Sequence, residues 1–342
     1  MKASVLAGSI ALLSMSLAAC GGSTTPTSTP SKTTVKVGMA YDIGGRGDKS
    51  FNDAAALGLE NAKKDFDIQT SELAASPGES DADRQTRLET LCKAGFNPVI
   101  AVGFAYAPAL GKAIKTCPDT HFGIVDDSSV TAPNVTSLVF AEEQGSFLVG
   151  AAAALKTTTG HIGFVGGCKV DLIGKFEAGY IAGAKKVKPD IKVDSNYLST
   201  VADNCSGFND PAKGKIAAGG MYDAGADIVY QAAGGSGVGV FQAAKEHGKK
   251  AIGVDSDQYN TVDASLKDVI ITSMLKRVDV AVYTFIKDNG NGNFKAGVQT
   301  FDLKVDGVGY ATSGGQIDDI KSKLEDFKAQ IVSGAITVPT KP

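Results

Sequence analysis

The sequence lacks tryptophan and has only three histidines among its 342 residues. His121, His161 and His247 stand in unrelated contexts without metal-ligand spacing, so we expect no metal site formed by the protein alone. The glycine-rich residues 234–239 lack the Gly-Lys-Ser/Thr of a phosphate-binding P-loop, and no nucleophile elbow occurs in the sequence. We therefore expect neither catalytic residues nor a cofactor.

A strong charge of one sign is also absent. The chain has 34 basic and 37 acidic residues, and its formal net charge of −3 provides no attraction to nucleic acid or to an anionic membrane. A hydrophobic content of 43% with 21% charged residues is typical of a soluble globular protein. The length suits two domains of ordinary size, and we expect a monomer.

The start of the chain has the pattern of an export signal. Lys2 precedes an apolar stretch, residues 5–17, that is too short to span a bilayer as a helix. The run Leu17-Ala18-Ala19-Cys20-Gly21 resembles a bacterial lipobox, in which the cysteine is lipidated; an ordinary secretory signal with a chance cysteine is the alternative. We expect a signal peptide over residues 1–19 and a flexible, lipid-anchored linker over residues 20–34. The protein would then lie on the extracytoplasmic face of the cell membrane.

Four cysteines follow Cys20, and an even number permits disulfides in an exported chain. They allow three pairings. Proximity in the sequence favours Cys92 with Cys117 and Cys168 with Cys205, which gives one bridge in each half of the chain. A catalytic thiol is disfavoured because no histidine is placed to activate one.

Short apolar runs alternate with helical patterns, and the alternation occurs twice. Strand–helix units fill residues 35–140, and similar units fill residues 160–255. Uninterrupted apolar strands separated by helices are typical of a parallel sheet covered on both faces. The pattern predicts two α/β lobes, and the cleft between them is the default place for a ligand.

The first strand leads through a glycine-rich turn into a helix, and ligands bind at such junctions in open α/β sheets. Within residues 37–52, Asp42 can accept hydrogen bonds, Phe51 offers a flat apolar face, and Asn52 carries both a donor and an acceptor. That set suits a flat heterocycle with a polar edge. The alternative is a plain turn in which Ser50 or Asp48 caps the helix and Phe51 packs in the core.

Two further acids close apolar strands, namely Asp126 and Asp255, and Gly234-Gly235 begins a loop into a helix. Carboxylates that face a cleft can accept from hydroxyl or ring N–H groups, and glycines let the backbone approach a ligand closely. Any one of these acids could instead cap a helix. Three acids at equivalent strand ends, with Asp42 included, favour a binding site over three separate caps.

Several segments together resemble the basic membrane protein family, which comprises substrate-binding lipoproteins of ABC importers and includes purine nucleoside receptors. The resemblance covers residues 35–332 and is carried by DIGG at 42–45, DKSFN at 48–52, FGIVD at 122–126, GVDSDQ at 253–258 and TSMLK at 272–276. It implies a type I periplasmic-binding-protein fold of class α/β, with two Rossmann-like lobes, parallel sheets and three crossovers. We expect the N-lobe to comprise residues 35–140 and 259–288, and the C-lobe to comprise residues 141–258 and 289–342.

By the same resemblance, aromatic rings stack on both faces of a purine base while polar groups hold its edge and its ribose. The stacking residues are Phe51 and Phe176, the base-edge residues are Asn52 and Asp126 with Asp42 beside them, and the ribose is held by Asp255, Lys276 and the backbone of Gly235. Cys168 and Cys205 depart from the family pattern, and a bridge between them would stiffen one wall of the cleft.

We therefore expect a lipoprotein that captures a purine nucleoside (guanosine, inosine or adenosine) and delivers it to an ABC transporter permease. One alternative is a binding protein of the same fold for a sugar or a furanose signal, because Phe51 and Phe176 could also stack on a pyranose. The other alternative is an extracellular nucleosidase that uses Asp42 or Asp126.

Overall fold

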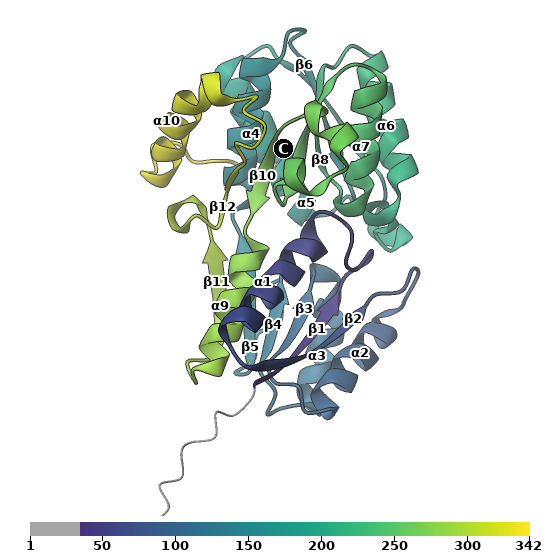
Figure 1. Ribbon diagram of the computed structural model, residues 1–342, viewed down its shortest axis with the longest axis vertical. Helices are drawn as coiled ribbons and strands as arrows, with labels where there is room; N and C mark the ends of the chain where they lie inside the picture. Colours follow the sequence, from purple (N-terminus) through teal and green to yellow (C-terminus); the bar gives the residue numbers. More distant parts are fainter. Residues whose placement is uncertain (1–34) are drawn as a thin grey trace, which may run out of the picture. The chain divides into compact units, whose positions relative to one another are not determined.

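The computed structural model describes residues 35–342, so the expected signal peptide, the lipid attachment at Cys20 and the linker lie outside the described residues. Two six-stranded sheets, one in each lobe, carry the fold (Figure 1). The first sheet has the order β11-β5-β4-β3-β1-β2 and contains β1 (Val35–Tyr41), β2 (Ile68–Ala74), β3 (Val99–Val102), β4 (Phe122–Val125), β5 (Val135–Phe140) and β11 (Gly297–Phe301). The second has the order β12-β10-β9-β8-β6-β7 and contains β6 (His161–Gly166), β7 (Lys192–Tyr197), β8 (Ile228–Ala232), β9 (Lys250–Asp255), β10 (Ile270–Lys276) and β12 (Val308–Tyr310).

The central strands are buried on both faces, which explains their continuous apolar sequences. Every residue of β3, β4, β6 and β8 is buried, as expected for parallel strands that helices cover from both sides. The strands pair in parallel except for β12, which runs antiparallel to β10 at the edge of the second sheet. The expected α/β fold with two parallel-sheet lobes is confirmed.

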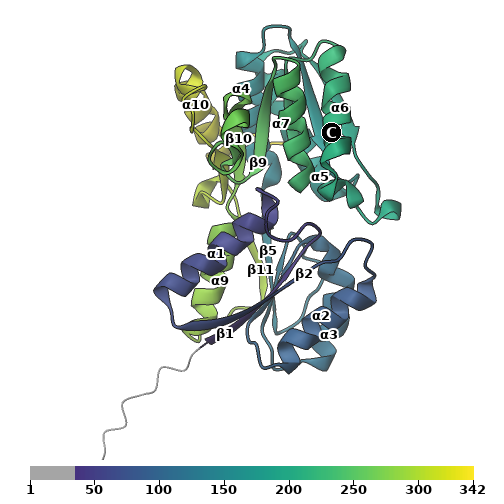
Figure 2. The same ribbon diagram turned by 45° about the vertical axis from the view of Figure 1, so that its right-hand side comes forward.

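Helices cover both faces of each sheet. On the first sheet, α1 (Phe51–Asp65) packs with α9 (Val278–Gly290) on one side, and α2 (Asp81–Lys93) packs with α3 (Ala107–Thr116) on the other (Figure 2). On the second, α4 (Glu142–Lys156) and α5 (Asp171–Val187) form one layer, and α6 (Pro211–Asp223) and α7 (Gly237–Glu246) form the other. The short α8 (Gln258–Thr261) follows β9, and α10 (Lys321–Val332) packs against α4.

The chain crosses between the lobes three times, after β5, after β10 and after β11. The expected boundaries of the lobes are wrong for two strands. β10 pairs with β9 in the second sheet although residues 259–288 were expected in the N-lobe. β11 pairs with β5 in the first sheet although residues 289–342 were expected in the C-lobe. β10 is a buried strand and β11 is a largely exposed edge strand, and neither pattern indicates which of the two sheets the strand joins.

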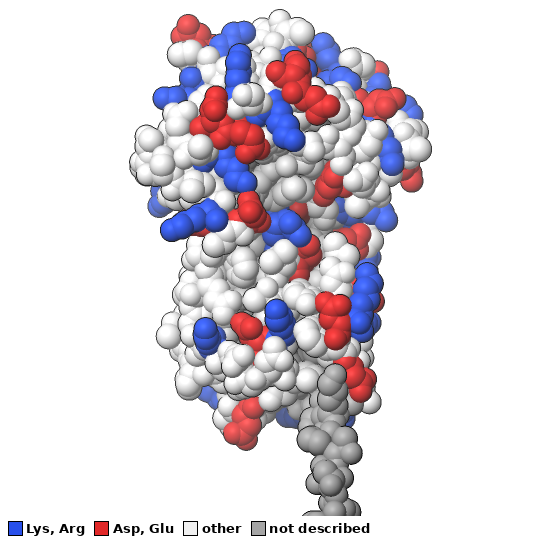
Figure 3. Space-filling model, turned by 60° about the vertical axis from the view of Figure 1, so that its left-hand side comes forward, with Lys and Arg blue, Asp and Glu red and all other residues white. Residues whose placement is uncertain are grey.

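The surface carries charges of both signs, and residues 35–342 contain no helix suited to span a membrane. On the face shown in Figure 3, basic and acidic side chains are interspersed over both lobes, in agreement with the small net charge. From residue 35 to residue 342, no helix has both the length and the apolar character needed to cross a bilayer.

Two helices of the second lobe approach each other so closely that only glycine fits at their contact. A Cβ added at Gly183 would lie 1.9 Å from the carbonyl oxygen of Phe147, and one added at Gly179 would lie 2.1 Å from that of Glu143. From the other side, a Cβ at Gly150 would lie 2.1 Å from the carbonyl oxygen of Tyr180. The backbones of α4 and α5 therefore touch, and α5 is fixed against the sheet.

We expect Gly183→Ala to lower the free energy of unfolding by about 3 kcal/mol or more, because the new methyl group overlaps a backbone oxygen that cannot move alone. Gly174 lies on the same helix with no atom within 4 Å of an added Cβ. Gly174→Ala should therefore stabilise the protein by about 0.5–1 kcal/mol through its better helix propensity. Urea denaturation of the three proteins measures both effects, and equal stabilities for the two variants would contradict the close contact.

Candidate ligand-binding cleft

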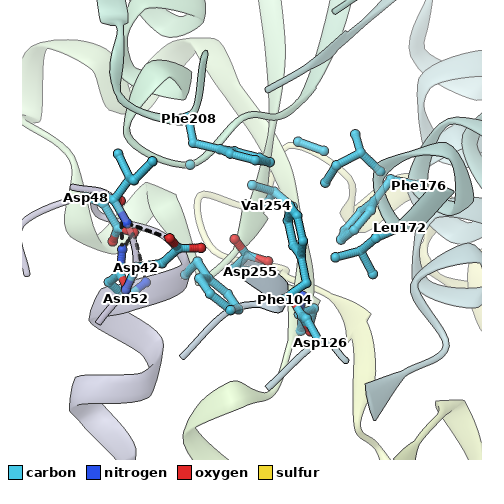
Figure 4. Close-up of a pocket in the computed structure, with 17 residues that line it drawn as sticks. Asp42, Asp48, Asn52, Phe104, Asp126, Leu172, Phe176, Phe208, Val254 and Asp255 are labelled. Atoms are coloured by element: carbon cyan, nitrogen blue, oxygen red, sulfur yellow. Dashed lines mark hydrogen bonds and ion pairs between the residues drawn. The ribbon is translucent and has the colours of Figure 1, made fainter. Parts of the chain in front are cut away.

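A cavity lies between the two lobes, where the strands of both sheets end (Figure 4). It encloses about 570 Å³, including the space at its open mouth. The first lobe contributes Asp42, Ile43, Asp48, Phe51, Asn52, Gly103, Phe104 and Asp126. The second lobe contributes Leu172, Ile173, Phe176, Phe208, Ala232, Gly234, Val254, Asp255 and Lys276.

The structure brings most of the predicted site residues together in this cavity. The residues that line it are Asp42, Phe51, Asn52, Asp126, Phe176, Asp255 and Lys276. The exception is Gly235, because its neighbour Gly234 lines the cavity in its place. Asn209 covers Gly235, and its Oδ1 would lie 3.4 Å from a Cβ added there.

The turn between β1 and α1 is held by the carboxylate of Asp48. Its oxygens accept hydrogen bonds from the backbone N–H groups of Ser50 at 2.9 Å, Asn52 at 2.8 Å and Asp53 at 3.1 Å. Asn52 and Asp53 lie in the first turn of α1 and Ser50 directly precedes it, where backbone N–H groups have no partners within the helix itself. Asp48 therefore caps α1, as one of the two interpretations of this stretch predicted.

The amide of Asn52, which we expect at the edge of a base, makes three hydrogen bonds within the protein. Its Oδ1 accepts from the backbone N–H of Asp42 at 3.0 Å. Its Nδ2 donates to the carbonyl of Ile43 at 3.3 Å and to Asp48 Oδ2 at 3.1 Å. Asn52 thus fixes the position of Asp42 at the floor of the cavity.

Asp42 lies directly over the backbone that follows β3. A Cβ added at Gly103 would lie 2.3 Å from Asp42 Oδ2, and Gly103 has a φ of +109°, so only glycine fits beneath the carboxylate. Asp42 Oδ1 accepts from the N–H of Ile43 at 2.8 Å. Burial raises the pKa of Asp42 to about 6, although this N–H group and the charge of Arg84 act in the opposite direction.

Lys276 places a buried ammonium group at the meeting point of the two lobes. Its Nζ lies 2.5 Å from Asp126 Oδ2 and 3.9 Å from Glu142 Oε1. The same atom lies 4.8 Å from the ring centre of Phe51 and 5.5 Å from that of Phe176, within the range of cation–π attraction. Rings from both lobes therefore border one charge.

The acids around Lys276 keep it protonated. Burial by itself lowers the pKa of an ammonium group, but the charges of Asp126, Asp255 and Glu142 outweigh it and the pKa of Lys276 lies above its ordinary value. Burial also raises the pKa of Asp255, and it raises that of Glu142 to about 7 against the opposing charge of Lys276. The cluster combines several charges with nearly complete burial.

Two carboxylates of the cavity have unusual backbones and spare oxygens. Asp126 and Asp255 have φ values of +69° and +63°, a left-handed conformation that non-glycine residues adopt rarely and often at functional sites. Asp126 Oδ1 is buried and has no hydrogen-bond partner among residues 35–342. An unpaired buried oxygen of this kind is costly unless a donor completes it.

The cavity is also lined by two aromatic residues that the sequence did not predict. Phe104 follows β3 in the 3-10 helix η1 (Phe104–Tyr106), and Phe208 lies in η3 (Ser206–Asn209). Their ring centres are 6.5 Å apart in an edge-to-face contact between the two lobes. Figure 4 shows both side chains in the cavity. The strand-end pattern that identified Asp126 also applies to Phe104. Phe208 lies in an irregular segment where no such pattern exists.

The two lobes are hydrogen-bonded at one side of the cavity, so the cleft is closed there. Ser50 Oγ donates to Asp255 Oδ2 at 2.7 Å, and Ser256 Oγ donates to the carbonyl of Ser50 at 2.9 Å. Gln258 Nε2 donates to the carbonyl of Lys49 at 3.0 Å. Opening the cleft requires these bonds to break.

Both disulfides pair cysteines that are near in the sequence. Cys92 in α2 is bonded to Cys117 at the end of α3, on the outer layer of the first lobe. Cys168 is bonded to Cys205, and this bond lies close to Phe208 and the cavity. The first bridge connects two helices, whereas the second connects two loops at the cleft.

We compared the chain with known families and known proteins. A family model described as "Bmp: ABC transporter substrate-binding protein PnrA-like" matches residues 34–341. The chain is 36% identical over 359 residues to the "ABC transporter nucleoside-binding protein BmpA" of Lactococcus lactis, covering all of both chains. It is 33% identical over 314 residues to an uncharacterized lipoprotein of Pyrococcus abyssi, covering 87% of this chain and 74% of that one.

Among solved structures, an ABC transporter solute-binding protein of Aeropyrum pernix superposes with a TM-score of 0.77 at 28% identity, over 90% of this chain and 93% of that one. The resemblance inferred from five short segments is thus confirmed over nearly the whole described chain. The protein belongs to the Bmp family of PnrA-like substrate-binding proteins of ABC transporters.

Proposed function

We propose that this substrate-binding protein captures a purine nucleoside in the cleft and delivers it to an ABC permease from the extracytoplasmic face of the membrane. The name of the Lactococcus lactis relative, a nucleoside-binding protein, supports the class of ligand. The name of the Pyrococcus abyssi relative, a lipoprotein, supports an anchor at Cys20. The side chains that line the cavity support recognition of a flat base and of a ribose.

The observation that carries the proposal is the unpaired Asp126 Oδ1 beside aromatic rings from both lobes. A purine offers ring N–H or amino donors at its edge and two flat apolar faces. The carboxylates of Asp126 and Asp42 are the acceptors available to such donors, while Phe51 and Phe176 are placed to contact the faces. Phe104 and Phe208 add apolar surface at the mouth.

The ribose would lie near the charged groups. Asp255 has one oxygen paired with Ser50, so its other oxygen can accept from a hydroxyl. The ammonium of Lys276 has three N–H donors, and among residues 35–342 its single hydrogen bond goes to Asp126. These groups favour a nucleoside over a free base.

The charge of the cluster also selects against phosphorylated ligands. Three acids, Asp126, Asp255 and Glu142, surround the ammonium of Lys276. Lys276 pairs closely with Asp126 and lies 3.9 Å from Glu142, so negative charge exceeds positive charge in the cluster. A 5′-phosphate brought to this site would meet more negative than positive charge, at a low effective dielectric constant. We therefore propose a neutral nucleoside, not a nucleotide, as the ligand.

The expected strength of binding is reasonable for a transport protein. Stacking contributes roughly 1–3 kcal/mol for each base–aromatic contact. Micromolar affinity requires about 8 kcal/mol in total. Two rings and a few charge-assisted hydrogen bonds in a dry cleft can supply this amount.

Calorimetry with guanosine, inosine, adenosine, ribose and galactose tests the ligand class, and we expect heat of binding with at least one nucleoside. Phe51→Ala should weaken that binding roughly tenfold to a hundredfold, because one stacking face is lost. Phe66→Ala is the matched control and should leave the affinity unchanged. Phe66 directly follows α1 and contacts Tyr283 outside the cavity.

Other outcomes of this experiment would identify another function. Binding of sugars alone would reject the nucleoside proposal in favour of a sugar receptor. Chromatography of inosine after incubation with the protein gives the second check. Free hypoxanthine above the uncatalysed level would indicate a nucleosidase.

We expect Asp42→Asn to raise the free energy of unfolding of the ligand-free protein by about 1–3 kcal/mol at about pH 7.5. Burial raises the pKa of Asp42 from 3.8 to about 6, so its charge destabilises the folded state above pH 6. As the pH falls through about 6, the folded protein binds the proton and this cost declines, so the gain should shrink by more than half at about pH 4.5. Asparagine can still accept from Ile43.

Chemical denaturation at the two pH values measures this difference, with Asp190→Asn at an exposed position as the control. A gain that is the same at both pH values would contradict the role of the buried charge. If Asp42 accepts from the base, the variant that is more stable should also bind guanosine more weakly.

A further inference from the structure

One segment of the second lobe, residues 199–210, leaves β7, reaches the mouth of the cavity and returns to α6; we call it the arm. It contains η2 (Val201–Asp203) and η3 and carries Phe208. Near its end, Asn209 lies close to the first lobe, since a Cβ added at Gly44 would be 3.5 Å from Asn209 Oδ1. The arm thus contacts both sides of the cleft.

The position of Phe208 depends on a close contact with the loop that follows β6. A Cβ added at Gly167 would lie 2.3 Å from ring carbon Cδ1 of Phe208, so the ring rests on the bare glycine. A Cβ added at Gly207 would in turn lie 2.2 Å from the carbonyl oxygen of Gly167. The ring reaches the cavity only while the arm and this loop stay in contact.

Hydrogen bonds of two serines hold the arm besides the disulfide. Ser236 Oγ donates to the carbonyl of Gly207 at 2.7 Å and accepts from the N–H of Asp210 at 2.6 Å. Residues 200–204 are exposed, and the side chain of Val201 is 64% accessible, so this part of the arm buries little apolar surface. Ser199 Oγ donates to the carbonyl of Gly167 at 2.7 Å and accepts from the N–H of Gly207 at 2.9 Å. A hydrogen bond contributes modestly to stability, because water replaces it in the open state.

The backbone of the arm is also unfavourable by itself. Asn204 and Cys205 are consecutive and both left-handed, with φ values of 50° and 51°. Non-glycine residues rarely adopt this conformation, and it persists only where other contacts hold it. The disulfide holds it directly, since Cys205 is tied to Cys168, the residue that follows Gly167.

We propose that the Cys168–Cys205 disulfide sets the affinity of the cleft by holding Phe208 in place, and that bound ligand in return stabilises the disulfide. The inference rests on the proposed nucleoside function. A dithiol that reduces the bond transfers two electrons and two protons to the sulfurs, which become thiols, while the dithiol closes to its own disulfide. The arm then loses its covalent tie to the loop after β6.

The two effects must have the same size, because coupling between sites is reciprocal. If loss of the bond weakens guanosine binding tenfold, saturating guanosine must lower the reduction potential of this disulfide by about 30 mV. The Cys92–Cys117 bond provides the internal control. It connects α2 with the end of α3, and neither helix contributes a residue to the cavity lining in the described part of the chain.

The first test compares C168A/C205A with C92A/C117A by calorimetry with guanosine. We expect at least tenfold weaker binding in the first variant and unchanged affinity in the second. Equal affinities of the two variants would overturn the proposal. The unmutated protein gives an independent measurement: in a dithiothreitol redox buffer, guanosine should shift the reduction of Cys168–Cys205 and leave that of Cys92–Cys117 unchanged.

Phe208→Ala, made in the wild-type protein and in C168A/C205A, shows whether the disulfide acts through this ring. We expect the substitution to weaken guanosine binding strongly when the disulfide is present and less than threefold in C168A/C205A, because the ring is already displaced there. Independent, additive losses would overturn the positioning role.

Hydrogen exchange of residues 199–210 tests the arm without any ligand. We expect faster exchange in C168A/C205A than in the wild-type protein and no change in C92A/C117A. Unchanged exchange in C168A/C205A would overturn the proposal whatever the cleft binds. Faster exchange in a protein that binds none of the nucleosides would support the role of the bond and reject the nucleoside function instead.

Discussion

The buried ammonium of Lys276 is the charge around which the two lobes meet. Lys276 ends β10 at one crossover of the chain, and Glu142 begins α4 at another. Asp126 reaches the same ammonium from the end of β4 in the first lobe. A charge removed from water must be paired with opposite charge, because the cost of leaving it alone is several kcal/mol or more. The position of this pair therefore constrains both lobes and two of the connections between them.

The cavity has an apolar surface and a polar surface, which suit different parts of one ligand. Rings and aliphatic side chains form its apolar surface, whereas acids and one lysine form its polar surface. The acids are held at a cost, since burial raises the pKa of Asp42 and of Asp48 to about 6. Functional sites commonly keep such unfavourable groups, and the rest of the fold compensates for them. Here the buried parallel strands and the close contact of α4 with α5 provide a rigid support.

Closure of the cleft uses different contacts at its two sides. At one side, backbone carbonyls of the β1–α1 turn accept hydrogen bonds from Ser256 and Gln258. At the other, the rings of Phe104 and of Phe208 on the arm meet in an edge-to-face contact. The polar side can exchange its partners with water, but the aromatic side gains from excluding water. Two lobes joined by three crossovers can move about these connections, as in other hinged binding proteins.

The sequence by itself determined the local architecture and the set of strand ends. Continuous apolar strands separated by helices require a covered parallel sheet, and the residues directly after such strands share one edge. This pattern identified Asp42, Asp126 and Asp255, and it could have identified Phe104. Resemblance to a family added Phe176 and Lys276, which no periodicity distinguishes from core and surface residues.

Only the tertiary structure decided the features that depend on distant partners. Strands β10 and β11 joined the sheets opposite to those expected, because a buried strand such as β10 or an edge strand such as β11 can pair in either sheet. The amide of Asn52 was consumed by its own turn, which a list of donors and acceptors does not show. Phe208 reached the cavity from an irregular segment whose path depends on a disulfide and on a glycine in another loop. The strand pairings and the position of Phe208 depend on contacts between residues far apart in the chain, and local propensity carries no information about them. The hydrogen bonds of Asn52 are local, but they depend on the folded path of the turn.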